Sequence, residues 1–315
     1  MTSVESPNAS PRKPSRAARI WQRTVVGTGL AAVVGGLLWA SYFPAGVWIA
    51  LVAALVLTLG GAHEAGRVGL FGQARMAWGP ALACVAALVV WWAALMPSGP
   101  LFLSQLDGAG RYFASLGLAS LASLGVLLAV FVSLRVRGDE NERRTMSWML
   151  FWGLWIALPL TGFFPIRLYA GANGLVTLVL LSKIGDVVGY YVGSWIGKSH
   201  PFPSISPGKT TAGCVGSLVA GTLFGYACMG LGLLPDARYG VLSALLAGAF
   251  INVASQAGDL LESVAKRRMG VKDSGRLFGP SGGVLDVVDS LQLSIPAALL
   301  TWPALFYLPL AGVGQ

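Results

Sequence analysis

Charged side chains are scarce in this chain of 315 residues, at 11% against roughly 25% in an ordinary soluble domain. Hydrophobic residues make up 55% of the sequence. So little charge excludes an ordinary water-soluble globular protein, because most of the chain has no side chains suited to face water. The composition indicates a polytopic membrane protein.

Cysteine and histidine are also rare. The three cysteines, Cys84, Cys214 and Cys228, lack the spacing of metal ligands, and the two histidines stand alone. We therefore interpret the cysteines as packing residues and expect no metal centre built on cysteine or histidine. Internal repeats of about 20 to 50 residues are lacking too, which disfavours a repeat architecture.

Long apolar runs are what the chain has in abundance. Crossing a bilayer takes about 17 to 25 residues, and nine candidate spans are found at 24–41, 44–61, 76–96, 113–134, 146–165, 172–196, 211–234, 237–258 and 283–311. The predicted fold class is an all-α polytopic membrane protein with about nine transmembrane helices. The first two spans are separated only by SYFP and could form a tight hairpin. The ninth contains Pro296, Pro303 and Pro309, so we expect it to kink or end early.

The lysines and arginines are distributed unevenly between the two sides of these spans. With the N-terminus inside, 18 of the 22 fall in cytoplasmic segments and only Arg111, Arg167 and Arg238 fall outside, while Lys183 lies within a span. Cytoplasmic loops normally hold the basic residues, so the pattern predicts N-in and C-out. The net charge of +9 then needs no nucleic-acid partner to explain it.

Three regions are predicted along the chain. Residues 1–23 are rich in Ser, Pro and Arg and are typical of a disordered basic cytoplasmic tail. Residues 24–171 form the N-terminal transmembrane helices. Residues 172–315 form a C-terminal catalytic region with a cytoplasmic loop at 259–282.

Acidic residues gather around that loop. The stretch GDLLESVAKRRMGVKDSGRLFGPSGGVLDVVDS, residues 258–290, holds five of the thirteen acids. Asp286 and Asp289 stand three residues apart, on one face of a starting helix, and Asp259 could meet them if the eighth and ninth spans pack together. Helix capping explains one such aspartate equally well. Three converging carboxylates ringed by basic residues would suit a magnesium ion that bridges a polyphosphate.

A second cluster spans residues 183–213. Its GKS and GKT sequences do not make a phosphate loop, because Val192 and Pro203 stand where the motif needs glycine. Lys209 next to a helix N-terminus still suggests an anion site. Lys183 and Asp186 lie on one helix face, either as a neutralising pair or as part of a polar cavity.

A dozen residues stand at the spacing of a known motif. They are Ser263, Lys266, Arg267, Lys272, Asp273, Gly275, Phe278, Gly279, Gly282, Gly283, Asp286 and Asp289, and they are preceded by Ser206, Pro207, Lys209, Thr210 and Gly213 and, in part, by Asp186 and Tyr190. In these positions the stretch 180–290 resembles the integral-membrane phosphatidate cytidylyltransferases, also called CDP-diacylglycerol synthases.

The resemblance implies transfer of a cytidylyl group from CTP to phosphatidate, with Mg²⁺ as one or two ions. It implies metal ligands at Asp259, Asp286 and Asp289, and a catalytic set that adds Lys272 and Asp273. The substrate-binding residues implied, some of them only in part, are Ser206, Lys209, Thr210, Ser263, Lys266, Arg267, Ser281, Gly282 and Gly283. The expected partners are CTP and membrane phosphatidate, with a homodimer left open and no nucleic acid. The expected location is the bacterial inner membrane, with the site at the cytoplasmic face.

Three positions depart from the family pattern. Ser281 replaces a histidine, Val287 an arginine and Ala212 a glutamate. These changes keep open a different lipid acceptor for a CTP-dependent enzyme, or an inactive relative. A secondary transporter is the alternative from another class, because charged residues and glycine-broken spans also mark those folds.

Overall fold

The protein is an all-helical bundle, described here from a computed structural model. The structure describes residues 16–69, 78–95, 106, 108–134, 141–279 and 282–308. The helices are α1 (Arg16–Ala40), α2 (Gly46–Arg67), α3 (Trp78–Leu95), α4 (Gly108–Leu134), α5 (Asn141–Thr161), α6 (Phe163–Tyr169), α7 (Gly171–Ile196), α8 (Thr211–Gly230), α9 (Val241–Arg268), α10 (Val284–Val288) and α11 (Leu291–Leu305). Within these residues the only β contact is an isolated bridge between Ala237 and Phe306.

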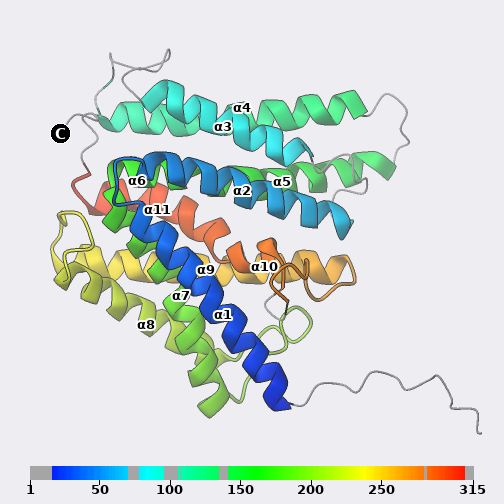
Figure 1. Ribbon diagram of the computed structural model, residues 1–315, viewed down its shortest axis with the longest axis vertical. Helices are drawn as coiled ribbons and strands as arrows, with labels where there is room; N and C mark the ends of the chain where they lie inside the picture. The colour runs from blue at the N-terminus through cyan, green and yellow to red at the C-terminus, as the bar shows by residue number, and fades with distance from the viewer. Residues whose placement is uncertain are drawn as a thin grey trace, which may run out of the picture.

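The helices are stacked side by side in layers (Figure 1). α3 and α4 lie together at one edge, α2 and α5 come next, α9 and α11 lie in the middle, and α7 and α8 close the other edge. α1 crosses this stack obliquely, so α1 and α2 meet at an angle at the SYFP turn and do not pack side by side as a tight hairpin.

The predicted all-α membrane fold is confirmed. Within the described residues, eight helical segments are long and apolar enough to cross a membrane. The apolar part of α1, Val25–Ala40, is shorter than the others. The count of nine spans and the N-in orientation therefore stay predictions, and residues 1–15 of the predicted tail lie outside the described residues.

Two predicted spans are divided in the structure. The span 146–165 is split at Gly162 into α5 and α6, and the span 283–311 is split at Asp289 and Ser290 into α10 and α11. The second break does not occur at a proline, since Pro296 and Pro303 lie inside α11. α11 ends at Leu305, before Pro309. Asp289 is the first residue of this break.

Large apolar side chains fill the core of the N-terminal helices. Trp91, Ile156, Leu160 and Phe164 are all almost completely buried there. Many valines and leucines on the outer faces are exposed, for example Val52, Val56 and Val89. Exposed apolar side chains on long apolar helices are what a surface in contact with lipid requires.

Candidate active site

Helix α9 supplies one polar stripe along its second half. Its positions three or four residues apart share a face, and they carry Asn252, Ser255, Gln256, Asp259, Glu262, Ser263 and Lys266. The stripe faces its neighbours: Asn252 Nδ2 donates to Ser217 Oγ of α8 at 3.1 Å, and Ser255 Oγ donates to Ser182 O of α7 at 2.7 Å. A helix that is polar on a buried face must have partners there, and these contacts lock α9 against α7 and α8.

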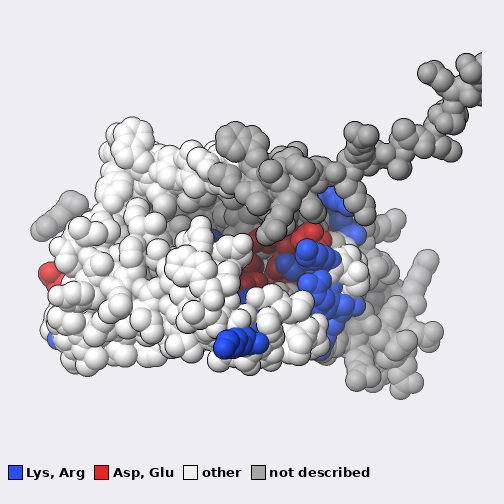
Figure 2. All heavy atoms as spheres, turned by 90° about the horizontal axis from the view of Figure 1, so that it is seen from below, with Lys and Arg blue, Asp and Glu red and all other residues white. Residues whose placement is uncertain are grey.

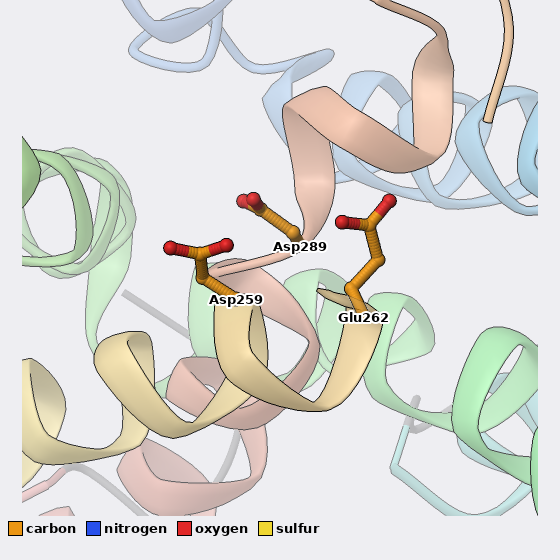
Figure 3. Close-up of side chains that lie close together, drawn as sticks. All are labelled: Asp259, Glu262 and Asp289. Atoms are coloured by element: carbon orange, nitrogen blue, oxygen red, sulfur yellow. The ribbon is translucent and has the colours of Figure 1, made fainter. Parts of the chain in front are cut away.

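Three carboxylates converge at the end of this stripe. One oxygen from each of Asp259, Glu262 and Asp289 lies within 4.8 Å of the others. Figure 3 shows Asp259 and Glu262 rising from the same side of α9 toward Asp289, which comes from the end of α10. We call these three residues the carboxylate trio. Glu262 is fully buried, and the other two are partly buried.

Each member of the trio is paired with a lysine from a different element. Lys209, in the loop before α8, lies 2.7 Å from Asp259 Oδ2, and Lys183 of α7 lies 3.5 Å from Asp289 Oδ1. Lys266 forms an ion pair with Glu262 one turn earlier on α9. Three like charges at this separation repel strongly where water is scarce. The three lysines offset that repulsion.

Asp286 has a different environment from the trio. Its Oδ1 lies 2.7 Å from Lys266 Nζ, and its Oδ2 accepts hydrogen bonds from Ser274 N at 3.0 Å, Ser274 Oγ at 2.7 Å and Gly283 N at 2.7 Å. Because Lys266 also pairs with Glu262, Asp286 is joined to the trio through this lysine. The family resemblance implied Asp286 as a direct ligand, whereas in the described geometry Glu262 is the third carboxylate beside Asp259 and Asp289.

A polar cavity of about 440 Å³ lies beside the trio. Side chains from α7, α8, α9 and the loop before α8 line it, and the charged ones are Asp186, Lys209 and Asp259. In Figure 2 acidic atoms appear in a hollow, with basic atoms beside them, at one end of a face that is otherwise mostly uncharged. The cavity volume is in the range of small-molecule sites.

Glycines make room for this cavity. Gly185, Gly189 and Gly193 repeat every four residues along α7 and line the cavity together with Gly213 of α8. A Cβ on Gly213 would lie 2.7 Å from Gly189 O, so only glycine permits this approach of the two backbones. Close backbone approach through small residues is typical of helices packed in membranes.

The loop 197–210 closes one side of the cavity. Thr210 is the N-cap of α8, and its hydroxyl accepts a hydrogen bond from Gly213 N at 3.1 Å. Ser206 lines the cavity, and Lys209 points to Asp259 rather than into solvent. The predicted anion site thus lies on the cavity wall, with its lysine engaged by a carboxylate.

The other predicted site residues are more scattered. Arg267 is exposed and donates to Ile205 O and Val271 O, and Lys272 and Asp273 are exposed in the following loop. Ser263 is buried on α9, Gly282 and Gly283 are buried before α10, and Ser281 lies outside the described residues.

Lys183 and Asp186 do not form the neutralising pair that their spacing allowed. Lys183 pairs with Asp289 and donates to Val287 O at 2.9 Å, whereas Asp186 lines the cavity. Of the two alternatives, the geometry favours the polar cavity. Lys183 thus brings a positive charge to the segment where Val287 replaces an arginine of the family pattern.

Two carboxylates of the site were missed by the sequence analysis. Glu262 could have been found, because it stands three residues after Asp259 on the same helix face. Glu64 of α2 had a weaker signal, a lone acid three residues after the apolar span predicted at 44–61. It is buried and accepts hydrogen bonds from Val284 N and Leu285 N at the start of α10.

The trio has the chemistry of a site for a hard divalent cation. Carboxylate oxygens are the ligands that Mg²⁺ and Ca²⁺ prefer. Glu262 is 0% exposed, and among the described residues its oxygens have the ion pair with Lys266 and no hydrogen bond. A buried oxygen with so few partners has coordination capacity left. The residues present therefore fit such an ion next to a cavity large enough for a small molecule.

Comparisons with known proteins agree with this chemistry. Residues 21–304 match the model of the Cytidylyltransferase family. Over 117 residues, 37% of this chain and 42% of the relative, the sequence is 41% identical to a phosphatidate cytidylyltransferase of Aquifex aeolicus. It is 35% identical over 169 residues, 53% of this chain and 60% of the relative, to the enzyme of that name from Pseudomonas aeruginosa. The chain thus spans about half the length of the curated relatives it matches.

Proposed function

The chain belongs to the Cytidylyltransferase family, and we propose that it transfers a cytidylyl group from CTP to phosphatidate, giving CDP-diacylglycerol and pyrophosphate. The observation that carries the proposal is the carboxylate trio beside a 440 Å³ cavity whose wall includes Lys209. Anionic substrates on both sides of the reaction need cations and positioned donors more than they need a protein nucleophile.

The proposed reaction is a single displacement at phosphorus. An oxygen of the phosphatidate phosphate forms a new bond to the α-phosphorus of CTP. The bond from that phosphorus to the oxygen bridging to the β-phosphate breaks, and pyrophosphate leaves with the electron pair. The lipid phosphate is already an anion, so no side chain has to remove a proton from it.

We assign the cation to the trio. Mg²⁺, as one or two ions, would supply charge neutralisation for the triphosphate and its leaving group. Asp259, Glu262 and Asp289 would hold it. Asp286 as a direct ligand stays a prediction from the sequence, since in this geometry it accepts from Lys266, Ser274 and Gly283.

Basic residues around the trio are proposed to bind phosphates. Lys209 lies on the cavity wall, and its ammonium is 2.7 Å from Asp259. If Asp259 holds a cation, its ion pair with Lys209 would weaken, and Lys209 would be available to bind a phosphate. Lys266, Arg267 and Lys272 are proposed for the remaining phosphate charge, Asp273 for the surrounding loop, and Ser206, Thr210, Ser263, Ser281, Gly282 and Gly283 for substrate contacts or for shaping the site.

The site is proposed to face the cytoplasm, at the inner membrane of a bacterium. The last turn of α9 carries Lys266, Arg267 and Arg268, and the loop after it carries Lys272 and Arg276, a concentration of basic residues that is typical of the cytoplasmic side. Single cysteines at residues 270 and 315 test this orientation through labelling with a membrane-impermeant maleimide on intact and opened cells. Position 315 should label in intact cells and position 270 only after opening; labelling of both from one side would contradict it.

The activity is tested with the purified full chain, CTP labelled at the α-phosphate, phosphatidate and Mg²⁺. Labelled CDP-diacylglycerol and one equivalent of pyrophosphate should appear, and neither should form with chelator or without phosphatidate. Asp236→Asn, in the loop between α8 and α9, is the matched control for variants of the trio and should keep full activity. An inert protein under these conditions contradicts the proposal. If turnover occurs only with another lipid phosphate, the proposed cytidylyl transfer stands and phosphatidate is the wrong acceptor.

A further inference from the structure

Glu64 joins the N-terminal helices to the segment that carries the aspartates. It lies near the end of α2 and is only 6% exposed. Its Oε1 accepts from Val284 N at 2.8 Å, and its Oε2 accepts from Leu285 N at 2.9 Å and from Ser274 Oγ at 3.1 Å. One side chain therefore contacts both ends of the segment that leads into α10. We call its described residues, 274–279 and 282–285, the turn.

Hydrogen-bond donors, and no ion pair among the described residues, stabilise the Glu64 carboxylate. No lysine or arginine of the described part of the chain forms an ion pair with it. A buried carboxylate without a cation is costly unless several donors point at it. The two N–H groups and the hydroxyl are those donors, so Glu64 and the turn stabilise each other.

The first turn of α10 depends on this carboxylate. The first N–H groups of a helix have no partner within the helix, and Gly283, the N-cap, has no side chain to offer. Glu64 accepts from the first two helical residues, and Asp286 Oδ2 accepts from Gly283 N at 2.7 Å. The position of α10, and with it of Asp289 at its end, is thus set from α2.

Ser274 connects Glu64 to Asp286. Its Oγ lies 3.1 Å from Glu64 Oε2 and 2.7 Å from Asp286 Oδ2. A hydroxyl has one proton, so only one of these carboxylates receives it at a time. Lys266 then links Asp286 to Glu262. A continuous polar chain therefore runs from α2 to the carboxylate trio.

Glycines on both sides leave space for this contact. A Cβ on Gly275 would lie 2.5 Å from Glu64 Oε1, and one on Gly283 would meet the same carboxylate. On α2, a Cβ on Gly60 would lie 2.9 Å from Val284 Cγ2. The backbone of the turn lies in close contact with Glu64, and larger residues at these glycine positions would move the turn away from α2.

From this geometry we infer that Glu64 is a positioning residue. It fixes Ser274 and the first residues of α10, and thereby holds Asp289 at the right place opposite Asp259 and Glu262. Glu64 itself is neither a member of the carboxylate trio nor among the residues that line the cavity. The inference rests on the proposed function only for the nature of the reaction. The placement of the turn can be measured without any turnover.

Glu64→Gln is the principal test. The amide keeps the shape of the side chain but points its NH₂ group at a backbone N–H, so at least one of the three hydrogen bonds is lost. Thr58→Val, another buried position on α2, is the matched control. We expect the Mg²⁺ concentration for half-maximal turnover to rise about tenfold in Glu64→Gln and to stay within twofold in the control, because the Asp289 ligand is misplaced. Glu64→Asp keeps the charge but shortens the side chain by one methylene. Its Mg²⁺ concentration for half-maximal turnover should lie between those of Glu64→Gln and the control.

Two measurements do not need activity. Trypsin should cleave after Arg276, an exposed residue of the turn, several times faster in Glu64→Gln than in the wild type and the control. Mn²⁺ binding, followed by electron paramagnetic resonance without substrates, should weaken by a similar factor to the Mg²⁺ requirement. These two results would stand even if CTP and phosphatidate proved to be the wrong substrates.

The opposite results overturn the inference. If Glu64→Gln folds and both its cleavage after Arg276 and its metal dependence match the wild type, Glu64 does not position the turn. If it fails to accumulate, Ser274→Ala replaces it, because this change removes only the hydroxyl between Glu64 and Asp286. Cleavage and metal dependence unchanged in Ser274→Ala would then reject the polar chain from α2 to the trio.

Discussion

The two halves of the molecule are built on different packing principles. Among α2 to α6, large side chains such as Trp91, Leu160 and Phe164 fill the interior. Among α7, α8 and α9, the interface is made of glycines and of polar groups such as Ser217 and Asn252. The second arrangement encloses a cavity of about 440 Å³.

Charge follows the same division. Among the described side chains of α2 to α6, Glu64 is the only buried acid, whereas Asp186, Asp259, Glu262, Asp286 and Asp289 all lie in or near the site. The sequence has four more acids in this region, at 107, 139, 140 and 142, which lie outside the described side chains. The described interior of the N-terminal helices is thus a scaffold with a single buried acid. In the C-terminal helices, polar groups that form the site replace part of the apolar packing. Glu64 is the residue through which the N-terminal scaffold contacts that site.

Of the changes predicted here, Asp289→Asn, in the half of the molecule that holds the site, should have the largest effect on turnover. The change removes one carboxylate of the trio and leaves Lys183 without its ion-pair partner. We expect turnover to fall by about 10³-fold, a typical loss for a group that stabilises the transition state electrostatically. Formation of labelled CDP-diacylglycerol measures it. Adding Asp286→Asn should cost far less than its separate effect, because residues that act as a unit are not additive.

The control for this change is Asp236→Asn, which alters an acid outside the site. It should leave turnover unchanged. Activity of Asp289→Asn within tenfold of the wild type at saturating Mg²⁺ would mean that the trio is not the reactive centre.

Leu160→Ala should weaken the apolar half without touching the chemistry. Leu160 is completely buried near the end of α5, and such a truncation typically costs about 2 to 5 kcal/mol through lost contacts and the cavity it leaves. The midpoint of thermal unfolding in detergent should fall clearly. The KM for CTP and the Mg²⁺ requirement should stay within twofold. A larger change in either of them than in stability would show that the two halves are not separable in this way.

One substitution, Gly→Ala, should have opposite effects in the two halves. At Gly213 a methyl group would press on Gly189 O of α7, and overpacking of this kind costs about 1 to 3 kcal/mol. The KM for CTP should rise with it, because both glycines line the cavity. At Gly125 of α4 nothing lies within 4 Å, so alanine should raise stability by up to about 1 kcal/mol through helix propensity.

Unfolding midpoints and KM values of the two glycine variants, measured side by side, sharpen the comparison. Equal responses at positions 125 and 213 would contradict a special role of small residues between α7 and α8.

Length and hydropathy were enough to predict the helices, because a segment that crosses lipid must satisfy its backbone within itself. The breaks at Gly162 and Asp289 were not predicted. Both depend on how a helix meets its neighbours: a Cβ on Gly162, for example, would lie 2.8 Å from Leu299 Cδ1 of α11. Local sequence does not contain that information.

The site was predicted in part for a similar reason. The spacing of the acids drew attention to Asp259, Asp286 and Asp289, but only the rotation of α10 relative to α9 decides which carboxylates converge. Glu262 was within reach of the pattern, since it shares the face of Asp259. The pairing of Lys183 with Asp289 was not, because spacing along α7 suggested Asp186. Lys183 and Asp289 meet only through the packing of α7 against the α10–α11 joint.

The contact between Glu64 and Val284 spans 220 residues of sequence, which has a consequence for biosynthesis. A ribosome adds about 5 to 20 residues per second, so the carboxylate of α2 waits roughly 10 to 45 s in the membrane before its partner is made. Until then no nascent chain can complete the turn. Enzyme activity would therefore switch on only once the whole protein has been inserted, and truncated chains would consume neither nucleotide nor lipid.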